Sequence, residues 1–434
     1  MSEKRDTLWS LSYIRLLLVQ VISAFSFYMI VTVLITYLTG ASVGATTAMA
    51  GVISGLFSIT SFVCRPFCGV ITDRWNRMAL LQGATLMMAL GCFGYTFSGS
   101  LPLIIGARLL HGVGFAVNST ALVALATSFI PEKRLGEGIG YIGVANTIAS
   151  AAAPGIGISI AHRFGEIGVF HLAGILAFAA LLLLLPFSGT VPEKRRGNRK
   201  GQFFSQTRTG GTSPEKRQIS GKLKTGDIFA VKVLGYCILG GLFSFTNGVI
   251  SSYLLSYSRI LGIANIGLYF TLNAAALFFV RPFAGKMMDR CGLKMIAYPG
   301  FLVTALSMFL LASANHWPFP AVAVIVASGV IRAVGQGSVN PALQTECIRI
   351  LGVERSGVAT SSFYLGGDIG QGIGPMIAGL VIGLGETEAK YYSVMFVVCG
   401  ILMTVAMLLF YIMEKRMKKN GEKTDEKQDL CIER

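Results

Sequence analysis

Apolar residues occur in long runs along this chain, and short polar segments separate the runs. Each run holds about 20 residues, which is the length that a helix needs to cross roughly 30 Å of hydrocarbon. We therefore predict an all-α membrane protein with twelve transmembrane helices, six in each half. The predicted helices cover residues 13–38, 48–71, 79–98, 102–127, 138–161, 167–187, 229–255, 265–287, 294–313, 318–346, 357–383 and 391–413.

The overall composition agrees with this pattern. Hydrophobic residues make up 53% of the chain and charged residues 13%, whereas about 25% of a typical soluble domain is charged. The net charge of +16 could indicate a nucleic-acid partner, but the cations are not interleaved with exposed aromatic residues as on a nucleic-acid-binding face. They lie in loops on one side of the predicted membrane, so we expect no nucleic-acid partner.

The distribution of lysine and arginine predicts the orientation in the membrane. Seven segments, residues 1–15, 72–78, 131–137, 188–228, 288–294, 349–356 and 414–434, hold 28 of the 37 lysine and arginine residues. The loops on the other side hold only Arg163, Arg259 and Lys390. Because cytoplasmic loops carry the excess of positive charge, we expect a multi-pass protein of the cell membrane with both termini in the cytoplasm.

The predicted helices and polar segments divide the chain into four regions. These are an N-terminal six-helix bundle at 1–187, a basic linker at 188–228, a C-terminal six-helix bundle at 229–413 and a cytoplasmic tail at 414–434. The linker cannot bury enough apolar surface to fold by itself. It is either a flexible tether between the halves or a basic lipid-binding or regulatory element.

A short segment occurs twice in the chain. Arg65-Pro-Phe-Cys-Gly-Val-Ile-Thr-Asp-Arg74 returns half a chain length later as Arg281-Pro-Phe-Ala-Gly-Lys-Met-Met-Asp-Arg290, without insertion or deletion. A further likeness relates residues 134–156 to residues 355–377, again at one constant spacing. Such a duplication is typical of a transporter whose two halves move about a site between them.

Pro154 and Pro375 stand at equivalent positions in the fifth and eleventh predicted helices. A proline removes one backbone hydrogen bond and should kink the helix. Gly157 and Gly374 lie near them and allow close packing or bending. We expect these four residues to be bending elements.

The duplicated segment carries the motif Gly-x-x-x-Asp-Arg-x-Gly-Arg/Lys after the second and eighth helices. The first copy is Gly69-Val-Ile-Thr-Asp73-Arg74-Trp-Asn76-Arg77 and the second is Gly285-Lys-Met-Met-Asp289-Arg290-Cys-Gly-Leu-Lys294. With this motif in both halves, the chain resembles the major facilitator superfamily over essentially its whole length. The resemblance implies two pseudo-symmetric six-helix halves and transport by alternating access. Asn76 stands where the motif has a glycine, and asparagine also tolerates the left-handed turn conformation.

The resemblance also implies a cytoplasmic gate built from both motifs. Asp73 would contact the start of the eleventh helix near residues 356–357, and Asp289 the start of the fifth near residues 135–136. A carboxylate can accept hydrogen bonds from the free amides at a helix N-terminus, where the macrodipole is positive. The alternative is that both aspartates only end helices in solvated turns. The predicted gate residues are Arg65, Gly69, Asp73, Arg74, Arg77, Arg281, Gly285, Asp289, Arg290 and Lys294.

Two further segments carry the resemblance, one to the superfamily and one to its drug:proton antiporter branch. Residues 108–112, Arg-Leu-Leu-His-Gly, match the superfamily signature Arg-x-x-x-Gly of the fourth helix. The antiporter signature Gly-x-x-x-Gly-Pro-x-x-Gly-Gly is matched by residues 370–379 on the eleventh helix and only in part on the fifth. The first helix lacks the acidic residue that many proton-coupled exporters of this superfamily carry there. The resemblance implies efflux, with protons as a second partner.

Ionisable side chains inside a bilayer cost several kcal/mol unless they are paired or face a cavity, so each is a candidate functional group. Arg65 and Arg281 lie about one turn from the ends of their predicted helices. They either form gate contacts or extend toward the membrane interface. Arg108 and Arg332 lie deeper, on helices that line the central cavity in the resembled family.

Asp368 is the carboxylate nearest to the middle of the membrane, roughly 18 Å into the eleventh helix. A carboxylate that alternates between an apolar environment and a neighbouring arginine can take up and release a proton. We predict that Asp368 couples transport to protons, with Arg332 as its partner. The alternative is a permanent ion pair with Arg332, or a bond to the backbone, that only holds helices together. Glu346, at the cytoplasmic end of the tenth helix, is the second candidate.

Polar residues within the predicted helices complete a candidate substrate cavity. His111 either relays protons or is a packed neutral imidazole. Asn118 and Asn340 either face the cavity or bond a neighbouring helix. The predicted cavity residues are Arg108, Arg332, His111, Asn118, Gln20, Tyr28, Asn247, Asn273, Gln336, Asn340 and Gln371.

These observations predict a secondary active transporter that exports a small organic solute, amphipathic or bearing a negative group, in exchange for protons. Uptake or facilitated passage of a hydrophilic or anionic metabolite is the alternative, and a non-transporting membrane sensor is the third possibility. An enzyme is disfavoured because the sequence has no metal-ligand cluster, and a primary pump because it has no Gly-x-x-x-x-Gly-Lys-Ser/Thr phosphate loop. We expect no cofactor and no metal, and a monomer in contact with membrane lipids.

Overall fold

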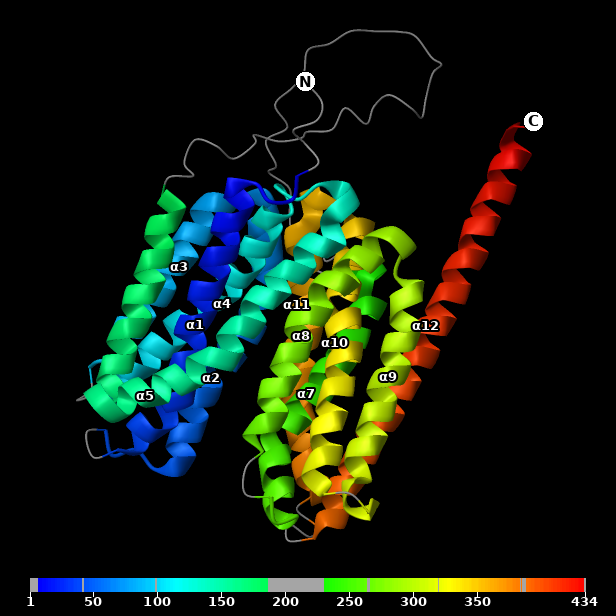
Figure 1. Cartoon of the computed structure of the whole chain (residues 1–434). Coiled ribbons are helices and arrows are strands. Elements are labelled where there is room, and N and C mark those ends of the chain that lie inside the picture. The colour runs from blue at the N-terminus through cyan, green and yellow to red at the C-terminus, as the bar shows by residue number, and fades with distance from the viewer. Residues whose placement is uncertain are drawn as a thin grey trace, which may run out of the picture.

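The computed structural model describes residues 7–40, 43–97, 100–185, 230–263, 266–318, 320–382, 384 and 388–432. These residues form long helices joined by short turns, and they contain no strand (Figure 1). The predicted all-α fold is confirmed. The helices are α1 (Leu11–Thr39), α2 (Thr47–Arg74), α3 (Arg77–Gly94), α4 (Leu101–Ala126), α5 (Leu135–Leu184), α7 (Leu234–Ile260), α8 (Gly267–Cys291), α9 (Lys294–Ala312), α10 (Ala321–Leu351), α11 (Ser356–Ile382) and α12 (Ala389–Ile432), with the short turns η2 (Glu132–Arg134), η4 (Val231–Val233), η5 (Ala314–His316) and η6 (Val353–Arg355).

Helix α5 contains two membrane spans. It is 50 residues long, but Gly165 has φ of 74° and ψ of 169°, which is outside the helical region. Figure 1 shows the parts before and after this glycine as separate rods. Eleven helices of the described chain are long and apolar enough to cross a membrane, and the break at Gly165 makes them the predicted twelve spans.

Asn76 is the N-cap of helix α3 and does not use the left-handed conformation that asparagine tolerates. Its φ is −68°, and its Oδ1 accepts hydrogen bonds from the N–H groups of Met78 and Ala79 at 2.9 and 3.2 Å. An asparagine at this position caps the helix by satisfying amides that have no partner within it. Gly292, its counterpart in the second copy of the motif, does have a positive φ of 78°. The two copies therefore turn differently.

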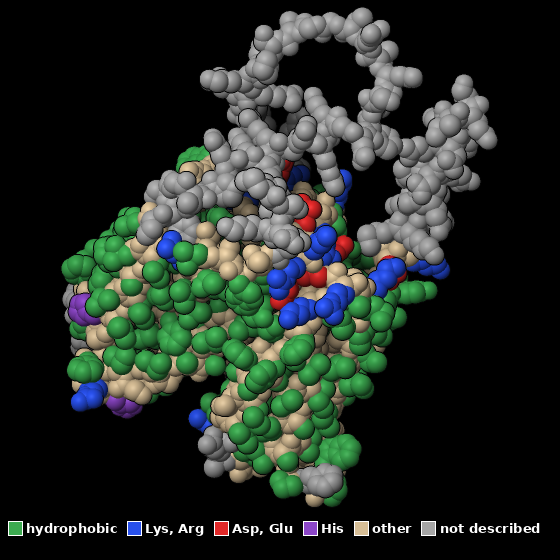
Figure 2. Space-filling model, turned by 45° about the horizontal axis from the view of Figure 1, so that its top comes forward, with side chains coloured by type: hydrophobic (Ala, Val, Ile, Leu, Met, Phe, Trp, Pro, Cys, Tyr) green, Lys and Arg blue, Asp and Glu red, His purple; other side chains and the backbone are tan. Residues whose placement is uncertain are grey.

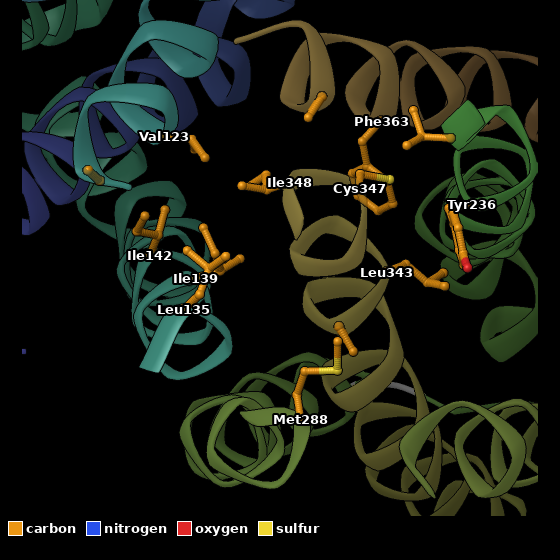
Figure 3. Close-up of a cluster of buried hydrophobic side chains, with 14 of the residues drawn as sticks. Val123, Leu135, Ile139, Ile142, Tyr236, Met288, Leu343, Cys347, Ile348 and Phe363 are labelled. Carbon is orange, nitrogen blue, oxygen red and sulfur yellow. The ribbon is translucent and has the colours of Figure 1, made fainter. Parts of the chain in front are cut away.

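The two halves share a hydrophobic core at one end of the molecule. One cluster of buried side chains combines residues of both halves, among them Val123 and Ile139 with Ile348. Figure 3 shows Ile348 of α10 directed toward α4 and α5. The two other clusters each belong to one half, the first within residues 29–173 and the second within residues 245–399. The halves are thus joined at one end and separate toward the other.

We call the joined end the motif end, because it holds Asp73 and Asp289. The start of α1 and the end of α12 also lie on this side (Figure 1). Figure 2 shows acidic and basic side chains gathered there, and a notch between the two halves at the opposite end, which we call the open end. The space between the halves is therefore closed toward the motif loops.

The polar segments between and after the halves are described only in part. The basic linker predicted at residues 188–228 lies outside the described residues. Helix α12 continues to Ile432, through most of the segment that we predicted as a cytoplasmic tail from residue 414 onward. Residues 414–432 lack proline and are rich in glutamate and lysine, which favour helix.

Both predicted bending prolines lie inside helices, Pro154 in α5 and Pro375 in α11. The glycines near them pack closely against the first helix of each half. A Cβ atom on Gly157 would lie 3.4 Å from the backbone of α1, and one on Gly374 would lie 2.5 Å from a carbonyl oxygen of α7. Close packing accounts for both glycines, and a bending role stays a prediction.

Candidate functional site

The Asp73 carboxylate binds the start of α11 in the opposite half. Its Oδ1 accepts a hydrogen bond from the N–H of Gly357 and its Oδ2 from the N–H of Val358, each at 2.8 Å. Gly69 permits this approach, because a Cβ atom there would lie 2.9 Å from the Cα of Val358. The carboxylate satisfies amides that have no partner within the helix and places negative charge at its positive end.

Asp289 makes the equivalent contact with the start of α5. Its two oxygens accept hydrogen bonds from the N–H groups of Gly136 and Glu137 at 2.8 and 2.9 Å. Gly285 has the same steric role as Gly69, since a Cβ atom on it would lie 2.7 Å from the Cα of Glu137. Both aspartates therefore contact the helix starts that we predicted, and the alternative of solvated turns does not describe them.

An arginine from the same half supports each aspartate. Arg77 Nη2 donates to Asp73 Oδ1 at 3.2 Å and to two backbone carbonyls just before α11 at 3.0 and 2.9 Å. Arg349 Nη2 donates to Asp289 Oδ1 at 2.6 Å. We did not predict Arg349, because it lies on α10, outside the duplicated motif. Arg77 thus adds a second link between the halves.

The other motif cations lie at the surface of the motif end. Arg74, Arg290 and Lys294 are all exposed. Lys294 forms an ion pair with Glu414 of α12, within its own half. This ion pair gives Lys294 no part in the contact between the halves, contrary to its predicted place in the gate.

About two turns closer to the middle of the membrane, Arg65 binds Asp368 across the two halves. Its Nε donates to Asp368 Oδ2 at 2.9 Å and its Nη1 to Ser119 Oγ at 2.7 Å. The ring of Tyr364 lies 4.9 Å from the guanidinium carbon. Our prediction that Arg332 is the partner of Asp368 is therefore wrong. Helices α2 and α11 adjoin across the interface, so the arginine of α2 reaches the carboxylate.

Arg281 occupies the corresponding place on α8. Its Nη1 donates to the Gly143 carbonyl and, at 2.7 Å, to Thr147 Oγ1. The constant spacing between the two similar segments relates Gly143 to Tyr364 and Thr147 to Asp368. The two arginines thus make equivalent contacts with the opposite half, but only the arginine of α2 meets a carboxylate. These contacts favour the predicted gate position over extension toward the membrane interface.

Arg332 belongs to a chain of polar side chains inside the C-terminal half. Its Nη2 donates to Asn247 Oδ1 at 3.2 Å, and Asn247 Nδ2 donates to Gln371 Oε1 at 3.1 Å. The fold thereby brings together three predicted cavity residues from α7, α10 and α11. Asn273 instead donates to the carbonyl of Gly329 at 2.8 Å.

Arg108 and His111 are buried within the N-terminal half. Arg108 Nη2 donates to the Ser54 carbonyl at 2.9 Å, and the Tyr95 hydroxyl lies 3.1 Å from His111 Nδ1. Arg108 is 2% exposed and His111 is 0% exposed. Neither side chain faces open space in this conformation, and for His111 the burial agrees with a packed imidazole.

Asn118 bonds a neighbouring helix, which is the second of the two alternatives that we considered for it. Its Nδ2 donates to Thr85 Oγ1 of α3 at 2.8 Å, and it is 3% exposed. The Tyr28 hydroxyl accepts a hydrogen bond from Asn146 at 3.4 Å. The remaining predicted residues are partly buried: Gln20, Gln336, Asn340 and Glu346.

Sequence reasoning missed three residues that contact the interface arginines. Ser119 and Tyr364 contact Arg65, and Thr147 contacts Arg281. None of them is charged, and each resembles many other residues of the spans. The constant spacing between residues 134–156 and 355–377 was the signal that could have pointed from Asp368 to Thr147.

A family model described as Major Facilitator Superfamily matches residues 16–264 and 233–432. The chain belongs to the major facilitator superfamily. The family and its structural neighbours are transporters and not enzymes, so this chain is a transporter.

Its relatives include exporters and efflux pumps. The transporter is 24% identical to the Staphylopine export protein of Staphylococcus aureus (strain Mu50 / ATCC 700699) over 378 residues, which cover 86% of this chain and 89% of that protein. It is 24% identical to Multidrug resistance protein 1 of Bacillus subtilis (strain 168), covering 85% and 88% of the two chains. The multi-drug resistance efflux pump PmrA of Streptococcus pneumoniae is 31% identical over 140 residues, 32% of this chain and 34% of the pump. The predicted resemblance to the efflux branch is confirmed.

Two solved structures share the fold. A bacterial homologue of the iron transporter ferroportin, in an outward-facing state, superposes with a TM-score of 0.70 at 13% identity, covering 93% of this chain and 99% of that one. The human organic anion transporter MFSD10 (TETRAN) gives a TM-score of 0.68 at 16% identity, covering 93% and 100%. These likenesses confirm the predicted major facilitator fold.

Proposed function

We propose that this transporter exports a small organic solute across the cell membrane by alternating access, in exchange for protons. The observation that carries the proposal is closure at one end only, with the halves joined at the motif end and separate at the other. Relatives named as an export protein and as efflux pumps support the direction. The lysine and arginine residues of the motif loops support a cytoplasmic location of that end and of both termini.

Asp73 and Asp289 form the cytoplasmic gate in this proposal. Each carboxylate accepts hydrogen bonds from two backbone amides of the opposite half, and one hydrogen bond to a charged group contributes about 1.5–3 kcal/mol. The buried cluster around Ile348 excludes water beside them. Both contacts must separate before the cavity can open to the cytoplasm.

Asp368 is the proposed proton site. Its side chain is 30% exposed and its carboxylate pairs with Arg65 of the opposite half. While Asp368 is charged, the ion pair ties α11 to α2; once it takes up a proton, that tie is lost. A proton arriving from the open end therefore favours opening toward the cytoplasm, which is the order that exchange against an exported solute requires. Glu346, partly buried on α10, remains the second candidate.

The proposal is tested by transport into and out of proteoliposomes. A thermal-shift screen of metabolites and drugs first identifies a ligand, because a ligand that binds only the folded protein raises its Tm. When a pH difference is imposed, the labelled ligand should then move toward the side of lower pH, opposite to the flow of protons. A protonophore should abolish this movement. Flux that does not depend on the proton gradient contradicts proton exchange. Ligand binding without any flux favours the third possibility, a non-transporting membrane sensor.

A further inference from the structure

Arg281 has no carboxylate partner among the described residues, unlike the equivalent arginine of α2. Arg65 pairs with Asp368 at 2.9 Å, whereas the equivalent residue beside Arg281 is Thr147, whose hydroxyl accepts at 2.7 Å. Among the described residues, no carboxylate forms an ion pair with Arg281. A guanidinium placed within a membrane protein without a counter-ion is costly, and an anion that joins it removes much of that cost.

The surroundings of Arg281 leave donors available. Its Nη1 is bound to Thr147 and the Gly143 carbonyl, but its Nε is buried without a hydrogen-bond partner. Position 143 has no side chain, and a Cβ atom there would lie only 3.0 Å from Nη1. At the equivalent position beside Arg65 stands the ring of Tyr364. The guanidinium of Arg281 therefore packs into the space that Gly143 leaves, and the residue as a whole is half-buried.

An aromatic surface begins beside the residue that precedes Thr147. Asn146 donates a hydrogen bond to the phenol of Tyr28 at 3.4 Å. The ring of Phe27 lies 5.1 Å from Tyr28, and it stacks on Phe57 and Phe115 at 4.8 and 4.7 Å. Phe27 is partly exposed, as is Phe115. Two of these rings lie near other arginines, Phe57 at 4.7 Å from Arg108 and Phe115 at 5.9 Å from Arg65. A solute that extends from Arg281 over the rings therefore meets positive charge and apolar surface together.

We propose that the substrate supplies the negative group that position 147 lacks. Arg281 is then the subsite for the oxyanion of an amphipathic organic acid, a carboxylate or a phosphate, whose apolar part lies on the rings around Phe27. This inference rests on the proposed function, in which the chain carries a small organic solute. It assigns the negative group to Arg281 rather than to Arg108 or Arg332.

Arg281 differs from Arg108 and Arg332 in its burial and in its position. Arg108 and Arg332 are each 2% exposed, and each is bonded within its own half. Arg281 lies between the halves, where a bound anion contacts α5 and α8 together. A ligand there is held by both halves, as a solute carried by alternating access must be.

The test is ligand binding by the purified full chain, followed as the rise in Tm. The probes are benzoate, phenyl phosphate and the neutral isostere benzamide. We expect one or both anions to raise Tm and benzamide to have no effect at the same concentration. Thr147→Asp places an internal carboxylate beside Arg281 and should weaken the anion at least about tenfold, equivalent to ~1.4 kcal/mol. Thr147→Asn has a similar shape without charge and should keep the anion affinity within about twofold.

Several results would overturn the inference. These are equal stabilisation by benzamide, an unchanged anion affinity in Thr147→Asp, and no response of the parent protein to either anion. Arg281→Lys keeps the positive charge without the two-pronged donor, so it should weaken the anion and retain the fold. The binding assay contains no proton gradient, so its result does not depend on the coupling proposal. If the anions bind as expected but flux in proteoliposomes does not respond to a proton gradient, the coupling proposal fails and this inference stands.

Discussion

Arg65 of α2 and Asp368 of α11 lie 303 residues apart in the sequence and form an ion pair of 2.9 Å between the two halves. The equivalent pair on the other side of the pseudo-twofold axis is Arg281 and Thr147, which meet through a neutral hydroxyl at 2.7 Å. At the level of these two arginines, the interface is therefore symmetric in its helices and asymmetric in charge. Asp368 is a carboxylate that a proton can neutralise, whereas Thr147, in the equivalent position, is not titratable.

Asp368→Asn should make the closure of the motif end independent of pH. Acid slows the reaction of any thiol with a maleimide, so the rate at position 348, which is buried between the halves, is divided by the rate for a cysteine at the exposed position 415. In the parent protein, acidification should raise this ratio. In Asp368→Asn the charge is absent at every pH, so the ratio should be high throughout. Glu354→Gln removes an exposed carboxylate at the same end and serves as the control. A pH response that persists in Asp368→Asn excludes Asp368 as the proton site.

Asp73→Ala combined with Asp289→Ala should shift the transporter toward a conformation open at the motif end. Each substitution removes two charge-assisted hydrogen bonds, and even one of them at about 1.5 kcal/mol changes the ratio of closed to open protein roughly tenfold. The measurement is the rate at which a maleimide labels Ile348→Cys at neutral pH, and we expect this rate to rise. If the double variant is labelled at the parent rate, the two aspartates do not hold the gate closed.

Gly285→Val should prevent full closure between α5 and α8. A Cβ atom at this position would lie 2.7 Å from the Cα of Glu137, a backbone atom that cannot move aside as a side chain can. We expect increased labelling of position 348 together with reduced transport. Gly83→Val is the matched control, because a Cβ atom there meets nothing within 4 Å. Equal behaviour of the two variants would contradict the close approach of the helices.

Cysteines placed at the two ends should report the orientation in the membrane. Lys390 lies at the start of α12 and its side chain is 66% exposed; Lys415 lies at the motif end and is exposed as well. A membrane-impermeant maleimide applied to intact cells should label Lys390→Cys at once and Lys415→Cys only after permeabilisation. The reverse order would place the motif end outside and invert the proposed direction of closure.

Much of the fold follows from local features of the sequence. Runs of apolar residues have the length of a membrane span, so the number of spans and their approximate positions could be predicted from hydropathy alone. The duplicated segments relate Asp73 to Asp289 without any coordinates. The family resemblance then pointed each aspartate to the correct helix start, because a carboxylate and a helix N-terminus attract each other wherever they meet.

The sequence by itself determined the spans, the duplication and the residue types at the interface, since these depend on length, periodicity and spacing along one chain. Only the tertiary structure decided that Asp368 pairs with Arg65 rather than Arg332 and that Asn118 bonds α3. It also revealed that Thr147 stands opposite Arg281. Such choices depend on which helices adjoin across the halves and on how far each side chain reaches. Helix contacts between distant segments leave no periodic trace in the order of residues.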